Sequence, residues 1–124
     1  MDKIIFKEES YQIIGKCMEV YKTLGPGFLE IVYKDALEYE FRKAGIPFER
    51  EKLYEVNYKE IRLPHCFYAD FIVYEKIILE VKGVAGIAVE FMVQAINYLK
   101  VSGNKLALIV NFGEERSNYK RIVL

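Results

Sequence analysis

The spacing of apolar residues changes at Pro47, from the three- and four-residue steps of a helix to the two-residue alternation of β-strands. Before Pro47, two helical stretches cover residues 9–24 and 28–44, and a Gly-Pro-Gly turn at residues 25–27 separates them. The stretches after Pro47 are rich in Tyr, Phe, Val and Ile and are bounded by polar turns: residues 48–58, 65–73 and 76–82. The pattern predicts two helices followed by three strands.

The rest of the chain contains one more helical stretch and then two strands. Apolar side chains recur with helical spacing over residues 87–101. Residues 106–110 are all apolar, as in a strand covered on both faces, and residues 119–124 are expected to form a short edge strand. The predicted order is ααβββαββ, an α/β fold with a mixed β-sheet flanked by helices. The three prolines lie at predicted element boundaries and no linker interrupts the sequence, so we expect a single domain over residues 1–124.

Composition and charge exclude several classes of protein. With 52% hydrophobic and 29% charged residues, the chain is neither disordered nor fibrous. Eighteen Lys and Arg balance 18 Asp and Glu, and this zero net charge disfavours strong non-specific binding to a nucleic-acid duplex. No stretch approaches the ~18 uncharged apolar residues of a membrane span, and the N-terminal residues include acids that a signal peptide lacks. We therefore expect a cytoplasmic protein with no membrane partner.

The cysteines and the histidine do not indicate a zinc site or a nucleophilic hydrolase. Cys17 and Cys66 lie far apart and match no zinc-ligand spacing, which predicts two reduced thiols. His65, the only histidine, precedes Cys66 in a predicted strand, so the two side chains point to opposite faces. A Cys-His nucleophilic pair is therefore not expected.

Three ionisable residues lie in strands that are otherwise apolar. Asp70 is the only charged residue of the run 67–73, and Asp is uncommon in strands. Glu80 and Lys82 lie in the run 77–82, and because they are two residues apart they point to the same face. Burying such groups unpaired costs roughly several kcal/mol each, which makes them candidates for a functional site. The alternative is a Glu80–Lys82 ion pair on a solvated face, with Asp70 capping a turn.

The loop between these two strands decides whether the two acids meet. If residues 74–76 form a three-residue hairpin loop, Asp70 lies directly opposite Glu80, with Cβ atoms ~4.5–5.5 Å apart. Like charges at that separation destabilise a sheet, and a divalent cation removes the conflict. Mg²⁺ suits the pair because it binds through one or two carboxylates and keeps several waters. A two-residue loop would place the acids on opposite faces of the sheet.

Two more polar residues lie on apolar helix faces. Glu30 shares a helical stripe with Tyr33 and Leu37, so its carboxylate is expected to point inward. Alternatively, Glu30 stabilises the positive end of the helix dipole, an effect of ~0.3–1 kcal/mol. Gln94 lies on a stripe with Tyr98, where its amide either holds a ligand or satisfies a buried backbone group.

A series of short motifs extends over nearly the whole chain. It comprises Leu-Gly-Pro-Gly at 24–27, Gly-Phe-Leu-Glu-Ile-Val-Tyr at 27–33, Gly-Ile-Pro-Phe-Glu-Arg-Glu at 45–51, Tyr-Ala-Asp-Phe-Ile-Val at 68–73, Leu-Glu-Val-Lys at 79–82, Gln-Ala-Ile-Asn-Tyr-Leu at 94–99 and Asn-Phe-Gly at 111–113. The series resembles the GxxExxY family of small bacterial and archaeal proteins. That family is placed in the PD-(D/E)XK nuclease-like superfamily, so the resemblance implies a restriction-endonuclease-like core.

The resemblance also implies roles for individual residues. Asp70 and Glu80 match the superfamily's metal-binding Asp and the Glu of its Glu-x-Lys motif. Lys82 matches the Lys that positions or activates the attacking water. Glu30 corresponds to the acidic residue of the first core helix.

The substrate side of the site is the part where this chain departs from the family pattern. The resemblance places Gln94 and Tyr98 in a helix motif near the substrate. Ala69 replaces the Pro that precedes the Asp in the superfamily signature, and Phe91 stands where relatives often carry a polar residue.

These residues lead to two hypotheses of different kinds. The first is a phosphodiesterase that uses Mg²⁺ or Mn²⁺ and acts on nucleic acid. The second is a non-catalytic binding or structural module on a nuclease-like scaffold, working as a homodimer or as a subunit of a protein partner. Near-neutral charge favours the second hypothesis, whereas mutually repelling acids in apolar strands favour the first.

Overall fold

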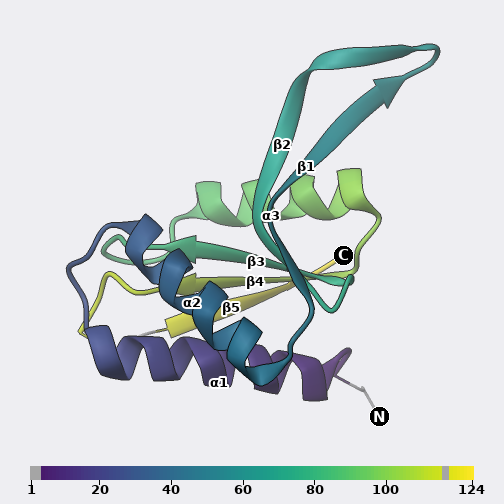
Figure 1. The fold of residues 1–124 in the computed structure, drawn as a ribbon. Coiled ribbons are helices and arrows are strands. Elements are labelled where there is room, and N and C mark those ends of the chain that lie inside the picture. Colours follow the sequence, from purple (N-terminus) through teal and green to yellow (C-terminus); the bar gives the residue numbers. More distant parts are fainter. Residues whose placement is uncertain (1–3, 116–117) are drawn as a thin grey trace.

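The computed structural model describes residues 4–115 and 118–124, and its elements follow the predicted order ααβββαββ (Figure 1). Within these residues the elements are α1 (Lys7–Leu24), α2 (Glu30–Ala44), β1 (Phe48–Tyr58), β2 (Ile61–Val73), β3 (Ile77–Lys82), α3 (Val89–Ser102), β4 (Leu106–Asn111) and β5 (Asn118–Val123). Most ends lie within two residues of the predicted ends. The exception is β2, which begins at Ile61 rather than at His65.

The strands form one mixed sheet in the order β1-β2-β3-β4-β5. β3 and β4 are parallel, and the other neighbouring strands are antiparallel. A parallel pair needs a crossover connection, which α3 supplies. α1 and α2 lie on one side of the sheet and α3 on the other, so the predicted α/β architecture is confirmed (Figure 1).

Each face of the sheet buries its own apolar core. The α1–α2 face buries Ile13, Cys17, Val20, Tyr33, Leu37, Phe41, Ile46, Phe71, Val73, Ile77, Leu79, Val81, Leu106, Leu108, Val110 and Phe112. The α3 face buries Ala69, Ile72, Ile78, Ala95, Tyr98, Leu99, Ala107 and Ile109. All six residues of β4 are buried, because its side chains alternate between the two cores. The continuous apolar run at 106–110 thus forms the predicted doubly covered strand.

A tight corner fixes where α2 begins relative to α1. The Tyr33 hydroxyl donates a hydrogen bond to the Gly25 carbonyl oxygen (2.6 Å) and accepts one from the Phe28 amide (3.1 Å). Tyr33 is fully buried and stacks on Phe112, with ring centroids 4.5 Å apart. These contacts hold the first turn of α2 close to the ends of β3 and β4.

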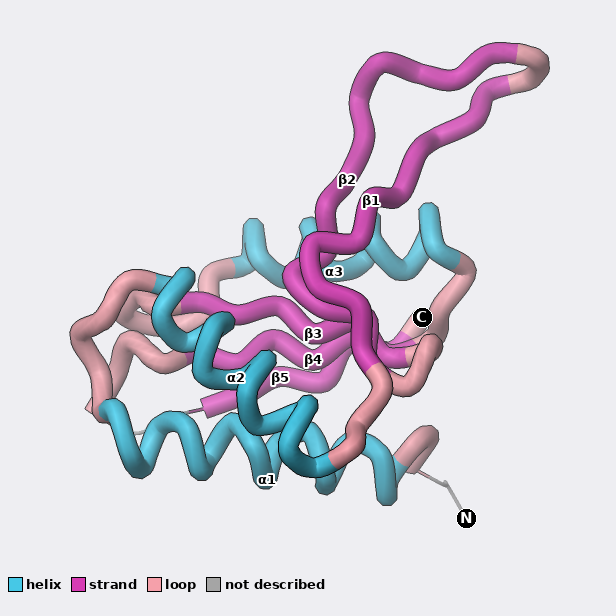
Figure 2. Tube along the Cα trace, viewed as in Figure 1, coloured by secondary structure: helices cyan, strands magenta, loops and turns pink. Residues whose placement is uncertain are grey.

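The hairpin of β1 and β2 extends far beyond the sheet (Figure 2). Only Phe71, Ile72 and Val73 of β2 pair with β3, whereas β1 and β2 pair with each other as far as Tyr58 and Ile61. We call residues 53–68 the arm.

Pro64 lies inside β2, so its predicted place at an element boundary is wrong. The pairing of β1 with β2 shifts register between Glu55 and Asn57, in the part of the hairpin opposite Pro64. A strand tolerates proline at such an irregular position because the residue there does not need to donate a backbone hydrogen bond to the neighbouring strand.

Candidate active site

The predicted hairpin register between β2 and β3 is confirmed. Val73 pairs with Ile77 and Phe71 with Leu79, around the three-residue turn at 74–76. Continuing this register places Asp70 opposite Glu80. At that point backbone pairing stops and the two strands separate, as Figure 2 shows.

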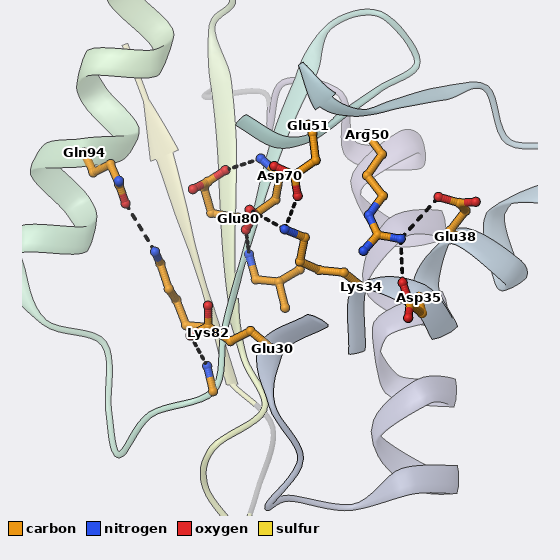
Figure 3. Close-up of polar contacts among 12 residues, drawn as sticks. Glu30, Lys34, Asp35, Glu38, Arg50, Glu51, Asp70, Glu80, Lys82 and Gln94 are labelled. Atoms are coloured by element: carbon orange, nitrogen blue, oxygen red, sulfur yellow. Dashed lines mark hydrogen bonds and ion pairs between the residues drawn. The ribbon is translucent and has the colours of Figure 1, made fainter. Parts of the chain in front are cut away.

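The Asp70 and Glu80 carboxylates replace the backbone ladder where the strands separate (Figure 3). The Asp70 amide donates a hydrogen bond to Glu80 Oε2 (2.8 Å). In return, the Val81 amide donates to Asp70 Oδ2 (2.7 Å). Each acid is therefore held by the other strand's backbone, and the charge of Asp70 acts on Glu80.

Glu80 is buried to a degree that is unusual for a carboxylate. The residue is 2% exposed, and the Asp70 side chain is 17% exposed. Burial, together with the neighbouring Asp70 charge, raises the pKa of Glu80 from 4.5 to about 8. The alternative of a solvated Glu80–Lys82 ion pair is wrong, because Glu80 is buried and, among the described residues, Lys82 forms no ion pair.

The Lys82 side chain points toward α3 and contacts Gln94, one of the predicted site residues. Its Nζ atom donates a hydrogen bond to Gln94 Oε1 (3.2 Å) and lies 4.6 Å from the centre of the Phe91 ring. The Phe91 ring therefore offers a cation–π contact at the position where the resemblance places a polar residue in relatives. The contact of Gln94 with Lys82 is neither of the two predicted roles, and its place near a substrate stays a prediction.

Tyr98 lies deeper on the same helix face. It is 4% exposed and packs edge-on against Phe67 at the root of the arm, with ring centroids 5.7 Å apart. Burial, and then the charges of Glu80 and Asp70, raise the pKa of the Tyr98 hydroxyl. The hydroxyl is therefore a neutral donor beside the acidic pair.

Glu30 reaches the end of β3 from the opposite helix layer. Its carboxylate Oε2 accepts a hydrogen bond from the Gly83 amide (3.0 Å). Tyr33 and Leu37 on the same stripe are fully buried, so the predicted inward direction is confirmed. Gly83 suits this close approach, because a Cβ atom there would lie 3.3 Å from Glu30 Cγ.

Two functional candidates, Lys34 and Glu51, were not among the residues we predicted. Lys34 Nζ lies 3.2 Å from Asp70 Oδ1 and also forms an ion pair with Glu51 (Figure 3). Burial acts most strongly on Lys34 and opposes its charge, but Glu51 and Asp70 outweigh it and raise the pKa of the ammonium group. A usable signal existed, since Lys34 follows Glu30 by one helical turn and therefore faces the same strand ends.

The loop after β4 supports the loop after β3. Asn111 is fully buried, and its Oδ1 accepts hydrogen bonds from the Val84 amide (3.2 Å) and the Gly113 amide (2.9 Å). Its Nδ2 is the one buried side-chain N or O atom without a hydrogen-bond partner among the described residues. A Cβ atom at Gly113 would lie 2.2 Å from the Val84 carbonyl oxygen, so only glycine fits this contact.

A family model supports the assignment that the site geometry suggests. The model of the PD-(D/E)XK nuclease superfamily matches residues 7–122, which is nearly the whole chain. The chain belongs to the PD-(D/E)XK nuclease superfamily. Its α/β fold is restriction-endonuclease-like, as the resemblance implied. The narrower resemblance to GxxExxY proteins stays a prediction.

A solved structure with the same fold supports this superfamily assignment at the level of architecture. The structure titled "Crystal structure of SSO0001" superposes with a TM-score of 0.63 at 16% sequence identity. The match covers 95% of this chain, which spans 60% of the length of the SSO0001 chain. No curated protein shows significant similarity to this superfamily member.

The acidic pair fits a divalent cation through the chemistry of its donors. Among residues 4–115 and 118–124, no three His, Cys, Asp or Glu side chains gather as a ready metal cage. Mg²⁺ does not require one, because one or two carboxylates and several waters suffice. Asp70 and Glu80 each accept a backbone amide through one oxygen, and the second oxygen of Asp70 contacts the Lys34 ammonium group at 3.2 Å. No helix in the described part of the chain is long and apolar enough to cross a membrane.

Proposed function

We propose that this protein is a metal-dependent phosphodiesterase of the nuclease type that acts on nucleic acid. The observation that carries the proposal is the meeting of Asp70 and buried Glu80 where β2 and β3 separate, two residues from Lys82. A structural role alone gives no reason to place two acids side by side in an apolar sheet, because their repulsion raises the free energy of the fold.

Asp70 and Glu80 would hold Mg²⁺ or Mn²⁺ between them. When bound, the ion polarises a phosphoryl oxygen and lowers the pKa of a bound water. The two acids are fixed for this task by the reciprocal hydrogen bonds to the Asp70 and Val81 amides. Their side chains therefore need little reorganisation before they bind a cation.

Lys82 stabilises the negative charge that develops on the phosphoryl group and positions the attacking water. Gln94 holds its ammonium group at 3.2 Å, and the Phe91 ring lies beside it. Tyr98 contributes a neutral hydroxyl beside the acids. Glu30 keeps the β3–α3 loop in place through the Gly83 amide.

The substrate would approach along the β3–α3 loop. Residues 84–88 and Phe91 line a hollow of about 350 Å³ next to Lys82. Phe28, which is 48% exposed, lies two residues before α2, and its carbonyl oxygen would be 3.7 Å from a Cβ atom on Gly83. Apolar and aromatic surfaces of this kind accept the faces of unpaired bases.

The test is cleavage of end-labelled single- and double-stranded DNA and RNA in Mg²⁺ or Mn²⁺. The wild-type chain is expected to cleave at least one of these substrates, and EDTA is expected to abolish cleavage. Asp70→Asn, Glu80→Gln and Lys82→Met are each expected to reduce the cleavage rate by about 10²-fold or more, since each removes a group that stabilises transition-state charge.

Glu9→Gln is the matched control, because Glu9 pairs with Lys76 (2.7 Å) just before β3 begins, away from the proposed site at its other end. This variant should cleave at the wild-type rate. Metal-dependent cleavage that is unchanged in Asp70→Asn and Lys82→Met would contradict the proposal.

The second candidate function is a non-catalytic binding or structural module. The zero net charge favours it, because most nucleic-acid-binding surfaces carry a clear basic excess. The same assay separates the two functions. Absence of cleavage on all four substrates, in either metal, would support the binding module.

A further inference from the structure

The Lys34 ammonium group lies between the carboxylates of Asp70 and Glu51. Its Nζ atom contacts Asp70 Oδ1 at 3.2 Å and an Oε1 oxygen of Glu51, and its side chain is only 12% exposed. Two carboxylate oxygens that flank one ammonium nitrogen can move inward to share one metal ion, whose ligand distances are shorter. The ammonium group thus lies where a cation bridging Glu51 and Asp70 would lie.

The backbone around Glu51 is shaped for this contact. In the β1–β2 register Arg50 pairs with Phe71 and Lys52 with Ala69, so Glu51 lies opposite Asp70 without a ladder pair of its own. Glu51 has φ +54°, a left-handed conformation inside a strand that costs a non-glycine residue about 1 kcal/mol or more. In this conformation Glu51 forms its ion pair with Lys34.

The register places three carboxylates in a row across three strands. Glu51 lies opposite Asp70, and Asp70 lies opposite Glu80. Lys34 contacts the first two, whereas Lys82 is directed toward Gln94 on the other side of Glu80. Without Lys34, the pair of Glu51 and Asp70 would have the same unbalanced charge as the pair of Asp70 and Glu80.

We propose that the Lys34 ammonium group takes the place of a second cation, so that the chain binds one divalent ion where the three carboxylates could otherwise hold two. The inference rests on the proposed function only for the ion at Asp70 and Glu80. Lys34 is a positioning residue in this scheme: it neutralises Glu51 and orients Asp70, and it does not contact the reacting atoms.

The test is a titration of the metal-free chain with Mn²⁺, followed by calorimetry and by the loss of the free-Mn²⁺ electron paramagnetic resonance signal. We expect one ion per wild-type chain and two per Lys34→Met chain. Removing Glu51 as well, in Lys34→Met/Glu51→Gln, should return the number to one. Lys34→Arg restores the positive charge and should also bind one.

Two further variants keep the test decisive. Lys34→Gln replaces the ammonium by a neutral amide, and it should bind two ions even if the methionine variant does not fold, which circular dichroism will show. Lys52→Met is the matched control, because Lys52 lies on the same strand but pairs with Glu49 (3.1 Å), and it should bind one ion.

The outcomes separate this inference from the proposed function. One ion in wild type and one in folded Lys34→Met and Lys34→Gln would overturn the inference and leave the proposed metal site intact. No ion in wild type, with one Glu51-dependent ion in Lys34→Met, would support the inference and contradict the proposed metal site. No ion in any variant would overturn both.

Discussion

The surroundings of the Glu80 carboxyl group disfavour its charged form. It is 2% exposed, its Oε2 accepts the Asp70 amide, and a second carboxylate lies beside it. Without a bound cation, burial and repulsion keep this carboxyl group protonated at neutral pH, since its pKa is raised to about 8. Binding of a divalent ion would then release a proton, because metal ligands are deprotonated groups.

This protonation predicts how the stability of the metal-free protein depends on pH. Between pH 4.5 and about 8 the folded state holds a proton on Glu80 that the unfolded state has lost. The free energy of unfolding should therefore fall as pH rises through this window, with a slope of at most about 1.4 kcal/mol per pH unit from this group. Urea unfolding in EDTA at pH 5, 6, 7 and 8 measures the slope.

Glu80→Gln should remove this part of the slope, because glutamine does not titrate but keeps an oxygen for the Asp70 amide. Glu9→Gln, at a partly exposed ion pair, should leave this part of the slope in place. If the Glu80→Gln and wild-type stabilities change in parallel between pH 5 and 8, Glu80 does not carry the raised pKa.

The loops after β3 and β4 set the position of Gly83 and Val84 at the site. They approach so closely that a Cβ atom on Gly113 would lie 2.2–2.6 Å from the backbone of these two residues. Backbone atoms cannot move aside as a flexible side chain can, so Gly113→Ala should destabilise the fold by about 1–3 kcal/mol or more. Thermal unfolding gives the change in free energy.

Gly15 provides the opposite case within α1. Nothing lies within 4 Å of a Cβ atom built there, and the residue is exposed in the middle of the helix. Gly15→Ala should therefore stabilise the protein by about 0.5–1 kcal/mol, since alanine loses less backbone freedom on folding. Similar effects of the two substitutions would show that the loops can separate without cost.

The sequence predicts best those elements in which the order of apolar and polar residues directly indicates which side chains are buried. Residues 106–110 are apolar throughout, and β4 is covered on both faces. Likewise, Asp70 and Glu80 interrupt apolar runs, and the hairpin register then follows from a three-residue turn. Such patterns are local, so a single sequence is sufficient to interpret them.

What the sequence could not predict depends on contacts between distant segments. The start of β2 at Ile61 was missed because the arm pairs only with itself and its exposed residues show little alternation. Glu51 was missed because a charge on a strand looks solvated until the fold brings it to Lys34, and Lys34 was missed although its one-turn spacing from Glu30 was a usable signal. Their partnership with Asp70 exists only in the tertiary structure.

The molecule as a whole has equal numbers of acidic and basic side chains, so it offers a partner no net charge. The arm has two acids, Glu55 and Glu60, and two bases, Lys59 and Arg62, apart from its histidine, and Arg62 already pairs with Glu55. A chain whose bases are matched by as many acids neutralises few phosphates, even though its fold is that of a nuclease superfamily.

Nucleic-acid binding should therefore depend only weakly on salt. For two or three phosphate contacts, the slope of log K against log [KCl] should be about −2 to −3. Fluorescence anisotropy of Asp70→Asn in metal-free buffer, between 50 and 200 mM KCl, measures the slope. Under the proposed mechanism this variant cleaves far more slowly than wild type, and it lacks one of the acids that repel phosphate. A slope steeper than about −6 would require an extended basic surface, which the balanced charge of this chain does not provide. Such a slope would also remove the main reason for considering a non-catalytic module, which is the absence of a basic excess.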